Sequence, residues 1–292
     1  MKKTYLGLAM LGVMAFSITA CGKRETCDRL SIVHIDQAIL GDAQKDLGVS
    51  IGIKKGNQTL QTALNTALST VTNETRTAWM LEAVDRAADV YKTTVTTPSV
   101  VPTDASLPVL TVGLECDYEP FNWTETTSNN FTYPIKGSDK FADGFDIQMA
   151  RYLAATMNYR LEIVKLDWEA LIPALDTGMI NAVIAGMTNT EERRLKIDFS
   201  EEYYRSELVL VVRENSELAN ATSLEAFKGK RIVSQVSTVT NDCIEPWRKQ
   251  FGVRHLKPMD TFSTCAIAVK NGTADAMTAE LPVANAICNS GR

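Results

Sequence analysis

The sequence lacks the features that mark fibrous, disordered or metal-binding chains. It has only 9 prolines, 16 glycines and 2 histidines among 292 residues. With 45% hydrophobic and 22% charged residues, the chain is neither collagen-like nor disordered, and it is long enough for the cores of two domains. Its cysteines show no CxxC spacing and have few histidines nearby to complete a metal set. The sequence therefore predicts a globular protein with no metal and no other cofactor.

The chain also lacks a block of positive charge. Its formal net charge is -5 and its pI is near 5.3, and its Lys and Arg residues are scattered rather than clustered. Such a pattern gives no electrostatic footprint for nucleic acid. We therefore expect a small-molecule partner and no nucleic acid.

No hydrophobic run is long enough to cross a bilayer, which takes about 20 residues. The longest run, from Tyr5 to Phe16, follows Lys2 and Lys3 and is typical of a signal peptide. The segment Ile18-Thr19-Ala20-Cys21 resembles a bacterial lipobox, in which the Cys becomes the diacylated N-terminus. An ordinary signal peptidase site that precedes a Cys is the alternative. The expectation is an extracytoplasmic protein, periplasmic or on the outer face, anchored to the cell membrane by lipid at Cys21.

Export changes how the remaining cysteines are interpreted. Five remain after Cys21 is used, namely Cys27, Cys116, Cys243, Cys265 and Cys288. In an oxidising compartment disulfides are favoured over metal binding. Two bridges and one buried free thiol account for all five, and Cys116 is the expected free thiol.

Apolar runs alternate with helix-periodic segments in the manner of an α/β fold. Strands are predicted at Val109–Leu114, Leu161–Leu166, Ala182–Ala185, Leu208–Val212, Arg231–Ser234 and Asp275–Thr278. A helix is predicted over Ile147–Met157, and the pattern favours an open parallel sheet. Residues 93–108, rich in Thr, Ser and Pro, have neither period and predict an extended linker.

Two loops carry candidate binding residues. Glu115 to Phe121 follows a predicted strand directly, at the sheet edge where open α/β folds bind ligands. Tyr118 in this loop is either a ligand contact or a hydrophobic lid. Trp168 is either a stacking wall or a core residue.

The segment "AGMTNTEERR" leaves a buried strand and begins a helix, with Thr188 and Glu191 spaced as a capping box. Arg193 then falls in the first turn, where the helix dipole favours negative charge. A carboxylate between Arg193, the Thr188 hydroxyl and the first amides would satisfy all three. The alternative is a plain cap with Arg193 paired to a neighbouring Glu. Ser237 and Thr238 mark a second helix start of the same kind.

Four segments together resemble the motifs of the family 3 bacterial solute-binding proteins, the polar amino-acid receptors of ABC importers. They are "VGLECDYEPFNW", "GFDIQMARYLAATM", "LDWEALIPALDTGMINAVIAGMTNTEERRLKIDFSEEYY" and "VKNGTADAMTAELPVA", and the resemblance spans about Val109 to Ala284. It implies an α/β fold of two lobes, the type II periplasmic-binding-protein fold, with the ligand in the cleft between them.

The resemblance also implies roles for single residues. Gly186, Thr188 and Arg193 match the segment that grips the ligand's α-carboxylate. Glu280 matches the acid that takes the α-amino group, although Asp is usual there. A Glu is used at this place in the related ionotropic glutamate receptors.

The remaining ligand contacts follow from the same resemblance. Tyr118 and Trp168 match the aromatics that sandwich the ligand, and Ser237 and Thr238 match the hydroxyls of lobe two. Glu115 matches the acid that faces the ligand side chain. The family usually has Gly before the Ser/Thr pair, where this chain has Val236, and this puts a left-handed backbone at that turn in doubt.

The order of segments departs from the family. "LGVSIGIKKGNQTLQTALNTAL", Leu47 to Leu68, resembles the crossover strand and helices with which members end, yet it comes first here. The sequence therefore predicts a circular permutant, which surface termini that lie close together make tolerable. The predicted divisions are 1–21 signal peptide with lipobox, 22–47 end segment completing lobe two, 48–92 crossover strand and C-terminal-type helices of lobe one, 93–108 linker, 109–206 main part of lobe one and 207–292 main part of lobe two.

The permuted order implies a disulfide between Cys27 and Cys288, which flank the break. Cys243 and Cys265 are the second predicted pair. We expect a monomer, and a dimer that exchanges residues 28–92 between chains is the alternative.

The function that these patterns favour is capture of a polar L-amino acid and its delivery, by hinge closure, to the permease subunits of an ABC importer. Glu115 favours glutamine, which ranks first, or a cationic amino acid. A dehydratase of cyclohexadienyl acids or a sensor domain is the alternative, since fold does not decide function. Glu115 is the only evident acid or base for an enzyme, and His34 and His255 are expected in surface or capping roles.

Overall fold

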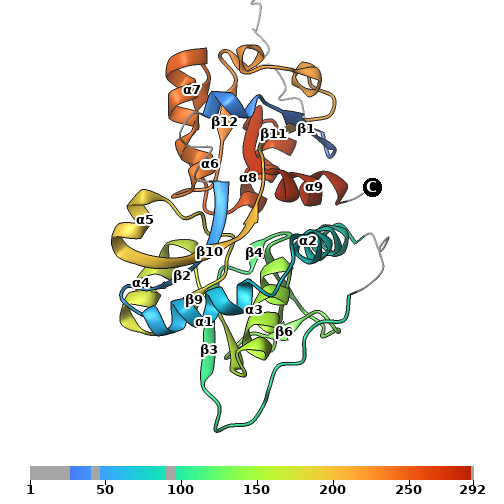
Figure 1. Ribbon diagram of the computed structural model, residues 1–292. Helices are drawn as coiled ribbons and strands as arrows, with labels where there is room; N and C mark the ends of the chain where they lie inside the picture. The colour runs from blue at the N-terminus through green and yellow to red at the C-terminus, as the bar shows by residue number, and fades with distance from the viewer. Residues whose placement is uncertain (1–26, 41–46, 90–95, 291–292) are drawn as a thin grey trace, which may run out of the picture.

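A computed structural model of the protein describes residues 27–40, 47–89 and 96–290. It has two lobes, stacked one above the other in Figure 1, and each is built on a five-stranded sheet. The predicted lipidation site at Cys21 lies outside the described residues. None of the helices in the described ranges is long and apolar enough to cross a membrane.

The elements alternate along the chain as the sequence predicts. The strands are β1 (Leu30–His34), β2 (Gly48–Lys54), β3 (Val109–Leu114), β4 (Asp117–Tyr118), β5 (Asn122–Glu125), β6 (Tyr133–Pro134), β7 (Phe141–Asp143), β8 (Arg160–Lys165), β9 (Ala182–Val183), β10 (Ile197–Arg205), β11 (Leu208–Arg213), β12 (Arg231–Val233), β13 (Arg254–His255) and β14 (Ala276–Glu280). The α-helices are α1 (Gln58–Leu68), α2 (Asn73–Ala87), α3 (Phe145–Thr156), α4 (Leu171–Thr177), α5 (Glu191–Lys196), α6 (Val239–Asp242), α7 (Ile244–Phe251), α8 (Phe262–Lys270) and α9 (Leu281–Asn289). Short 3₁₀ helices cover Trp168–Ala170, Glu217–Asn220 and Leu224–Phe227.

Lobe one contains the sheet with strand order β10-β2-β9-β3-β8 and a smaller sheet, β4-β5-β7-β6. Strand β3 runs parallel to β8 and β9, whereas β2 runs antiparallel to β9 and β10. Apolar residues of β2, such as Ile51 and Ile53, are fully buried. The sheet is therefore mixed, not parallel throughout as its alternating pattern predicted.

Lobe two contains the sheet with strand order β1-β11-β14-β12-β13. Strand β11 pairs antiparallel with β1 and β14, and β12 pairs parallel with β13 and β14. Every residue of β11 is buried, as expected for an apolar run covered on both faces. The prediction of an open parallel sheet is wrong here too, because β1 and β11 run against their neighbours.

The chain passes between the lobes twice, once from β10 to β11 and once between β1 and β2. The described residues at these two places are in contact. Strand β10 pairs with β2, with Arg205 opposite Gly48. The side chain of Gln37 also binds both the amide and the carbonyl of Leu208. These contacts bring the parts of the chain that connect the two lobes together (Figure 1).

Helix α1 packs on lobe one, and helix α2 packs on both lobe one and α9 of lobe two. Helix α1 begins at the cap of Asn57, whose side chain accepts from the Leu60 amide. Its buried residues are Leu60, Leu64, Ala67 and Leu68. Helix α2 is joined to β7 by the ion pair between Arg86 and Asp143. Residues 96–108 contain neither helix nor strand, and Thr96 donates to the buried Glu82 of α2.

The prediction of disulfides between Cys27 and Cys288 and between Cys243 and Cys265 is wrong, because neither bond is present among the described residues. Cys243 packs on one face of the lobe-two sheet with Leu210, whereas Cys265 packs in the cluster on the other face. The sheet therefore separates these thiols, and both are free. Cys27 is also a free thiol, and its amide donates to the Lys270 carbonyl at the end of α8. Cys288 is buried on α9.

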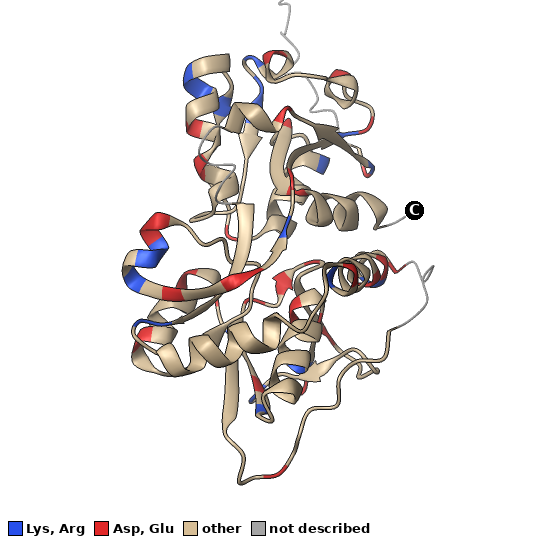
Figure 2. Cartoon of the chain, viewed as in Figure 1, with Lys and Arg blue, Asp and Glu red and all other residues tan. Residues whose placement is uncertain are grey.

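Charged side chains of both signs are spread over the two lobes (Figure 2). This agrees with the scattered Lys and Arg residues of the sequence. His34 is exposed beside Glu207, which is the surface role expected of it, whereas His255 is half-buried and bonds to Asn241.

Candidate functional site

A small cavity of about 20 Å³ lies between the lobes. It is bounded by the ends of β3, β12 and β14 and by the loops that follow β9 and precede α4. Every ligand-binding residue predicted from the sequence lines it, except Ser237. The lining residues are Glu115, Tyr118, Trp168, Gly186, Thr188 and Arg193 from lobe one and Gln235, Thr238, Val239, Phe262 and Glu280 from lobe two.

Two larger cavities adjoin this small one. The first, of about 530 Å³, lies along α5 and shares Trp168 and Arg193 with it. The second, of about 460 Å³, shares Trp168 and Glu115. This second cavity is acidic, since Lys165 is the one cation among its lining residues, which also include Glu115, Asp117, Asp167, Glu169 and Asp260.

Arg193 lies in the first turn of helix α5. Its guanidinium donates to the carbonyl and the hydroxyl of Thr188, and it reaches across the cleft to the Ser237 carbonyl at 2.9 Å. It also lies 5.2 Å from the centre of the Trp168 ring, in a cation–π contact. The predicted Thr188–Glu191 capping box is wrong, because α5 begins at Glu191 and its cap is Thr190. Thr188 is thereby left to Arg193.

Glu280 enters the cavity from the end of β14. It is only 7% exposed, and one of its oxygens is buried without a hydrogen-bond partner among the described residues. Burial raises the pKa of the Glu280 carboxyl, while the Tyr118 hydroxyl and the charge of Arg193 act in the opposite direction. The cavity therefore holds a carboxylate that is short of donors.

Glu115 is a second buried carboxyl, at the end of β3. Its Oε2 accepts from the Gln235 amide at 3.0 Å, and its Oε1 is buried without a partner among the described residues. Burial raises the pKa of Glu115 to about 8, and Asp117 adds to this, while Gln235 and Lys165 oppose it. A cation placed against Oε1 would restore the charged form.

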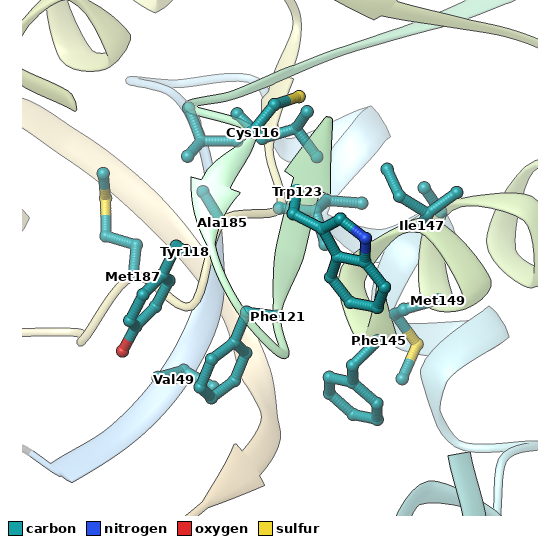
Figure 3. Packing of buried hydrophobic residues seen from close by; sticks show 14 of the residues in the cluster. Val49, Cys116, Tyr118, Phe121, Trp123, Phe145, Ile147, Met149, Ala185 and Met187 are labelled. Atoms are coloured by element: carbon teal, nitrogen blue, oxygen red, sulfur yellow. The ribbon is translucent and has the colours of Figure 1, made fainter. Parts of the chain in front are cut away.

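Aromatic rings form the walls. Tyr118 stacks on Phe121 of the same loop at 4.9 Å and on Phe262 of lobe two at 5.0 Å; Figure 3 shows the first pair with Ala185 and Met187 around it. Phe262 was missed from the sequence because it is the first residue of α8 and no local pattern points it at Tyr118.

Gly186 is the one residue of the site that has to be glycine. Its φ is +58°, in the left-handed region. A Cβ at this position would come within 2.7 Å of a Tyr118 ring carbon. The glycine of "AGMT" thus lets the loop after β9 approach the aromatic wall.

Ser237 and Thr238 differ in their positions. Thr238 lines the small cavity and caps α6, with its hydroxyl accepting from the Asn241 amide. Ser237 lines the 530 Å³ cavity instead, and its carbonyl accepts from both Trp168 and Arg193. The left-handed residue of this turn is Ser237, with φ of +58°, and not Val236.

Gln235 and Val239 were also missed from the sequence. Both flank the Ser237-Thr238 pair, and this proximity is the signal that would have found them. No group of three or more His, Cys, Asp or Glu side chains in the described ranges is arranged to hold a metal ion.

Comparison with known proteins gives consistent matches. A profile of the bacterial extracellular solute-binding proteins, family 3, matches residues 110–279. The arginine-binding extracellular protein ArtP of Bacillus subtilis is 29% identical over 145 residues, 50% of this chain and 51% of ArtP. The chain spans about half the length of the curated relatives it matches.

Solved structures of amino-acid-binding proteins also match the chain. The arginine-bound form of truncated ArgBP from T. maritima matches with a TM-score of 0.52 and 32% identity, over 63% of this chain and 78% of that one. An ancestral arginine-binding protein bound to glutamine matches with a TM-score of 0.51 and 31% identity, over 60% of this chain and 71% of that one.

Proposed function

Since the chain belongs to the bacterial extracellular solute-binding proteins of family 3, we propose that it captures a free polar amino acid between its two lobes. The observation that carries this proposal is that Arg193, Thr188 and Glu280 line one cavity. Arg193 donates to the Thr188 hydroxyl, and one oxygen of Glu280 has no donor among the described residues. Arg193 and Thr188 supply donors for the α-carboxylate. Glu280 supplies an acceptor for the α-ammonium group, and Tyr118 and Trp168 cover the ligand between them.

The ligand's side chain is expected to point toward Glu115. The acidic cavity beyond that residue has room for a long side chain and contains Asp117, Asp167 and Asp260. A cationic side chain would pair with these carboxylates, and glutamine could donate its amide to Glu115. We therefore rank the cationic amino acids ahead of glutamine, which reverses the ranking drawn from the sequence. The two structural relatives, bound to arginine and to glutamine, are compatible with either choice.

A thermal-shift screen of the twenty amino acids tests this function. A ligand at 100 times its Kd adds roughly 2.7 kcal/mol to the free energy of unfolding. We expect Arg193→Ala to cost about 2 to 5 kcal/mol of affinity for the best ligand. Arg194→Ala is the matched control, since Arg194 bonds to Asn189 outside the cavity. No stabilisation by any amino acid, or equal affinity in the two variants, would contradict the proposal.

We also propose that the protein delivers its ligand to the permease subunits of an ABC importer, and membership of the family supports this. The lobes would open and close about the paired β2 and β10 segments, and the closed arrangement is held by bonds across the cleft. Trp168 and Arg193 donate to the Ser237 carbonyl, and Gln235 donates to Glu115. Small-angle scattering should show compaction on ligand binding. An unchanged radius of gyration in a protein that binds its ligand would count against hinge closure.

A lipid anchor at Cys21 and an extracytoplasmic location complete the proposal. Its support is the lipobox-like segment at the end of the hydrophobic run, which lies outside the described residues. We expect Cys21→Ser to move the protein from the membrane fraction to the soluble fraction. Cys27→Ser, six positions along the chain, should leave it membrane-bound. Equal distribution of both variants would refute the anchor.

Circular permutation is the remaining part of the proposal. The family match begins at residue 110, yet β1 and β2, which precede it, are edge and interior strands of the two sheets. Helix α9 packs beside β1, so the segments that permutation would separate lie together. Within these 292 residues, the strands that complete both lobes thus come before the matched region instead of after it.

A further inference from the structure

Two of the lobe-one loops that line the cavity share an unusual backbone feature. One contains Glu115 and Tyr118, and the other contains Gly186 and Thr188. Each loop has one residue in the left-handed region, Cys116 with φ of +53° and Gly186 with φ of +58°. For Cys116 this conformation is sterically unfavourable, so something must hold it.

The amide of each left-handed residue donates to a buried side chain. The Cys116 amide donates to Asn122 Oδ1 at 2.8 Å, and the Gly186 amide donates to the Tyr203 hydroxyl at 2.9 Å. Asn122 and Tyr203 are both fully buried. The two loops are therefore held in the same way by residues of two different strands, β5 and β10.

Both of these side chains end on one carboxylate. Asp146, on α3, accepts from Asn122 Nδ2 at 2.8 Å through one oxygen and from the Tyr203 hydroxyl at 2.7 Å through the other. Asp146 is fully buried. Burial raises the pKa of Asp146 to about 7, and the bonds from Tyr203 and Asn122 oppose the rise. The two bonds thus favour the charged form, which can accept from both partners at once.

We propose that Asp146 is a positioning residue for ligand binding, which fixes both left-handed turns of lobe one through Asn122 and Tyr203. The loops also touch each other, since a Cβ on Gly186 would lie 2.7 Å from Tyr118. A shift of either turn would therefore displace both Tyr118 and Thr188, which is a proposed donor to the ligand's α-carboxylate. The inference rests on the proposed function, because it concerns affinity for the same ligand.

The test compares two neighbouring tyrosines of β10. Tyr203→Phe removes the hydroxyl that links Asp146 to Gly186. Tyr204→Phe removes a hydroxyl that has no hydrogen-bond partner among the described residues. The ring of Tyr204, which the variant keeps, packs against Phe121 and Phe145. Calorimetry with L-arginine and L-glutamine should give a Kd at least tenfold higher for Tyr203→Phe than for wild type, and within twofold of wild type for Tyr204→Phe. Asp146→Asn should resemble Tyr203→Phe, because an amide cannot accept from both partners.

Stability and affinity must be separated. Circular dichroism at the calorimetry temperature establishes that each variant is folded, and equal Kd values for Tyr203→Phe and Tyr204→Phe would overturn the inference. Hydrogen exchange of the wild type provides a test that needs no variant. The amides of Cys116 and Gly186 should be protected with and without ligand, and exchange as fast as in exposed loops would also overturn it. A wild type that binds none of the twenty amino acids would instead overturn the proposed function, and this inference with it.

Discussion

Buried carboxyls dominate the chemistry of the cleft. Glu115, Glu280 and Asp146 each have a pKa raised by burial, because desolvation disfavours the charged form. Asp146 meets its donors within lobe one, whereas Glu115 and Glu280 each keep one oxygen without a donor among the described residues. The two glutamates can therefore gain from a ligand that carries cationic groups.

The raised pKa of Glu115 makes binding of a cation depend on pH. Below a pKa of about 8, the carboxyl must lose its proton before it can pair with a guanidinium. We expect the affinity for L-arginine to rise with pH up to that value, by up to about tenfold per pH unit, and then to level off. Calorimetry in buffers of different ionisation enthalpy should detect proton release at pH 7.

Glutamine is the control ligand for this dependence. It shares the α-amino and α-carboxylate groups, so any titration of Glu280 affects both ligands alike. The ratio of the two affinities should therefore change with pH in the wild type and stay constant in Glu115→Gln. A constant ratio in the wild type would show that Glu115 does not pair with the ligand side chain.

Helix α2, which precedes the linker, packs on lobe one and on α9 of lobe two. Helix α2 is joined to β7 by Arg86 and Asp143, whose side chains are 6% and 2% exposed. The Arg86 guanidinium also lies over the Phe131 ring, 4.2 Å from its centre. Such a buried pair adds little by itself, but loss of one partner leaves an uncompensated charge.

Arg86→Met should consequently loosen α2 from the lobe. We expect the free energy of unfolding, measured in urea, to fall by about 3 to 5 kcal/mol. Arg248→Met is the matched control, because Arg248 also makes a two-pronged pair, with Glu245, but at the surface. That variant should lose less than about 1 kcal/mol. Equal losses would mean that α2 is not anchored by this pair.

At the scale of the whole molecule, residues 27–40 and 47–89 supply one strand to the five-stranded sheet of each lobe. Strand β1 lies at the edge of one sheet, and β2 lies between β10 and β9 in the other. The order in which these strands occur along the chain matters less than their contacts, because the cost of closing a loop grows only slowly with its length.

A reordered chain tests the permutation. Residues 96–292 followed by a short Gly/Ser linker and residues 27–92 should fold and bind the same amino acid, with a Kd within about threefold of the original, by this loop-length argument. A chain without residues 27–92 should not fold, since β9 and β10 would lose the strand between them. Failure of the reordered chain to fold would refute the permutation.

The oligomeric state is tested by measuring the mass in solution of the original chain and of the reordered chain. A monomer is expected, because one chain can complete both sheets. A mass twice that of the chain in the original order, but not in the reordered one, would indicate that residues 28–92 are exchanged between two copies.

Much of the fold and of the candidate site was predictable from the sequence. Local patterns placed β3 at 109–114, most of α3 and the irregular segment before β3. The ligand-binding candidates were found through the motifs that resemble the family, and all except Ser237 line the same cavity. Such information is local, because caps, turns and alternating burial depend on neighbours in the chain.

The three-dimensional packing decided the rest. The pairing of β1 and β2 with distant strands, and with it the mixed character of both sheets, has no local signature. Cys243 and Cys265 are kept apart by a sheet that lies between them. Among the hydrogen bonds that link Cys116 and Gly186 to Asp146, the one from Tyr203 to Asp146 joins residues 57 positions apart. These contacts depend on which faces meet after folding, and that is a property of the assembled lobes.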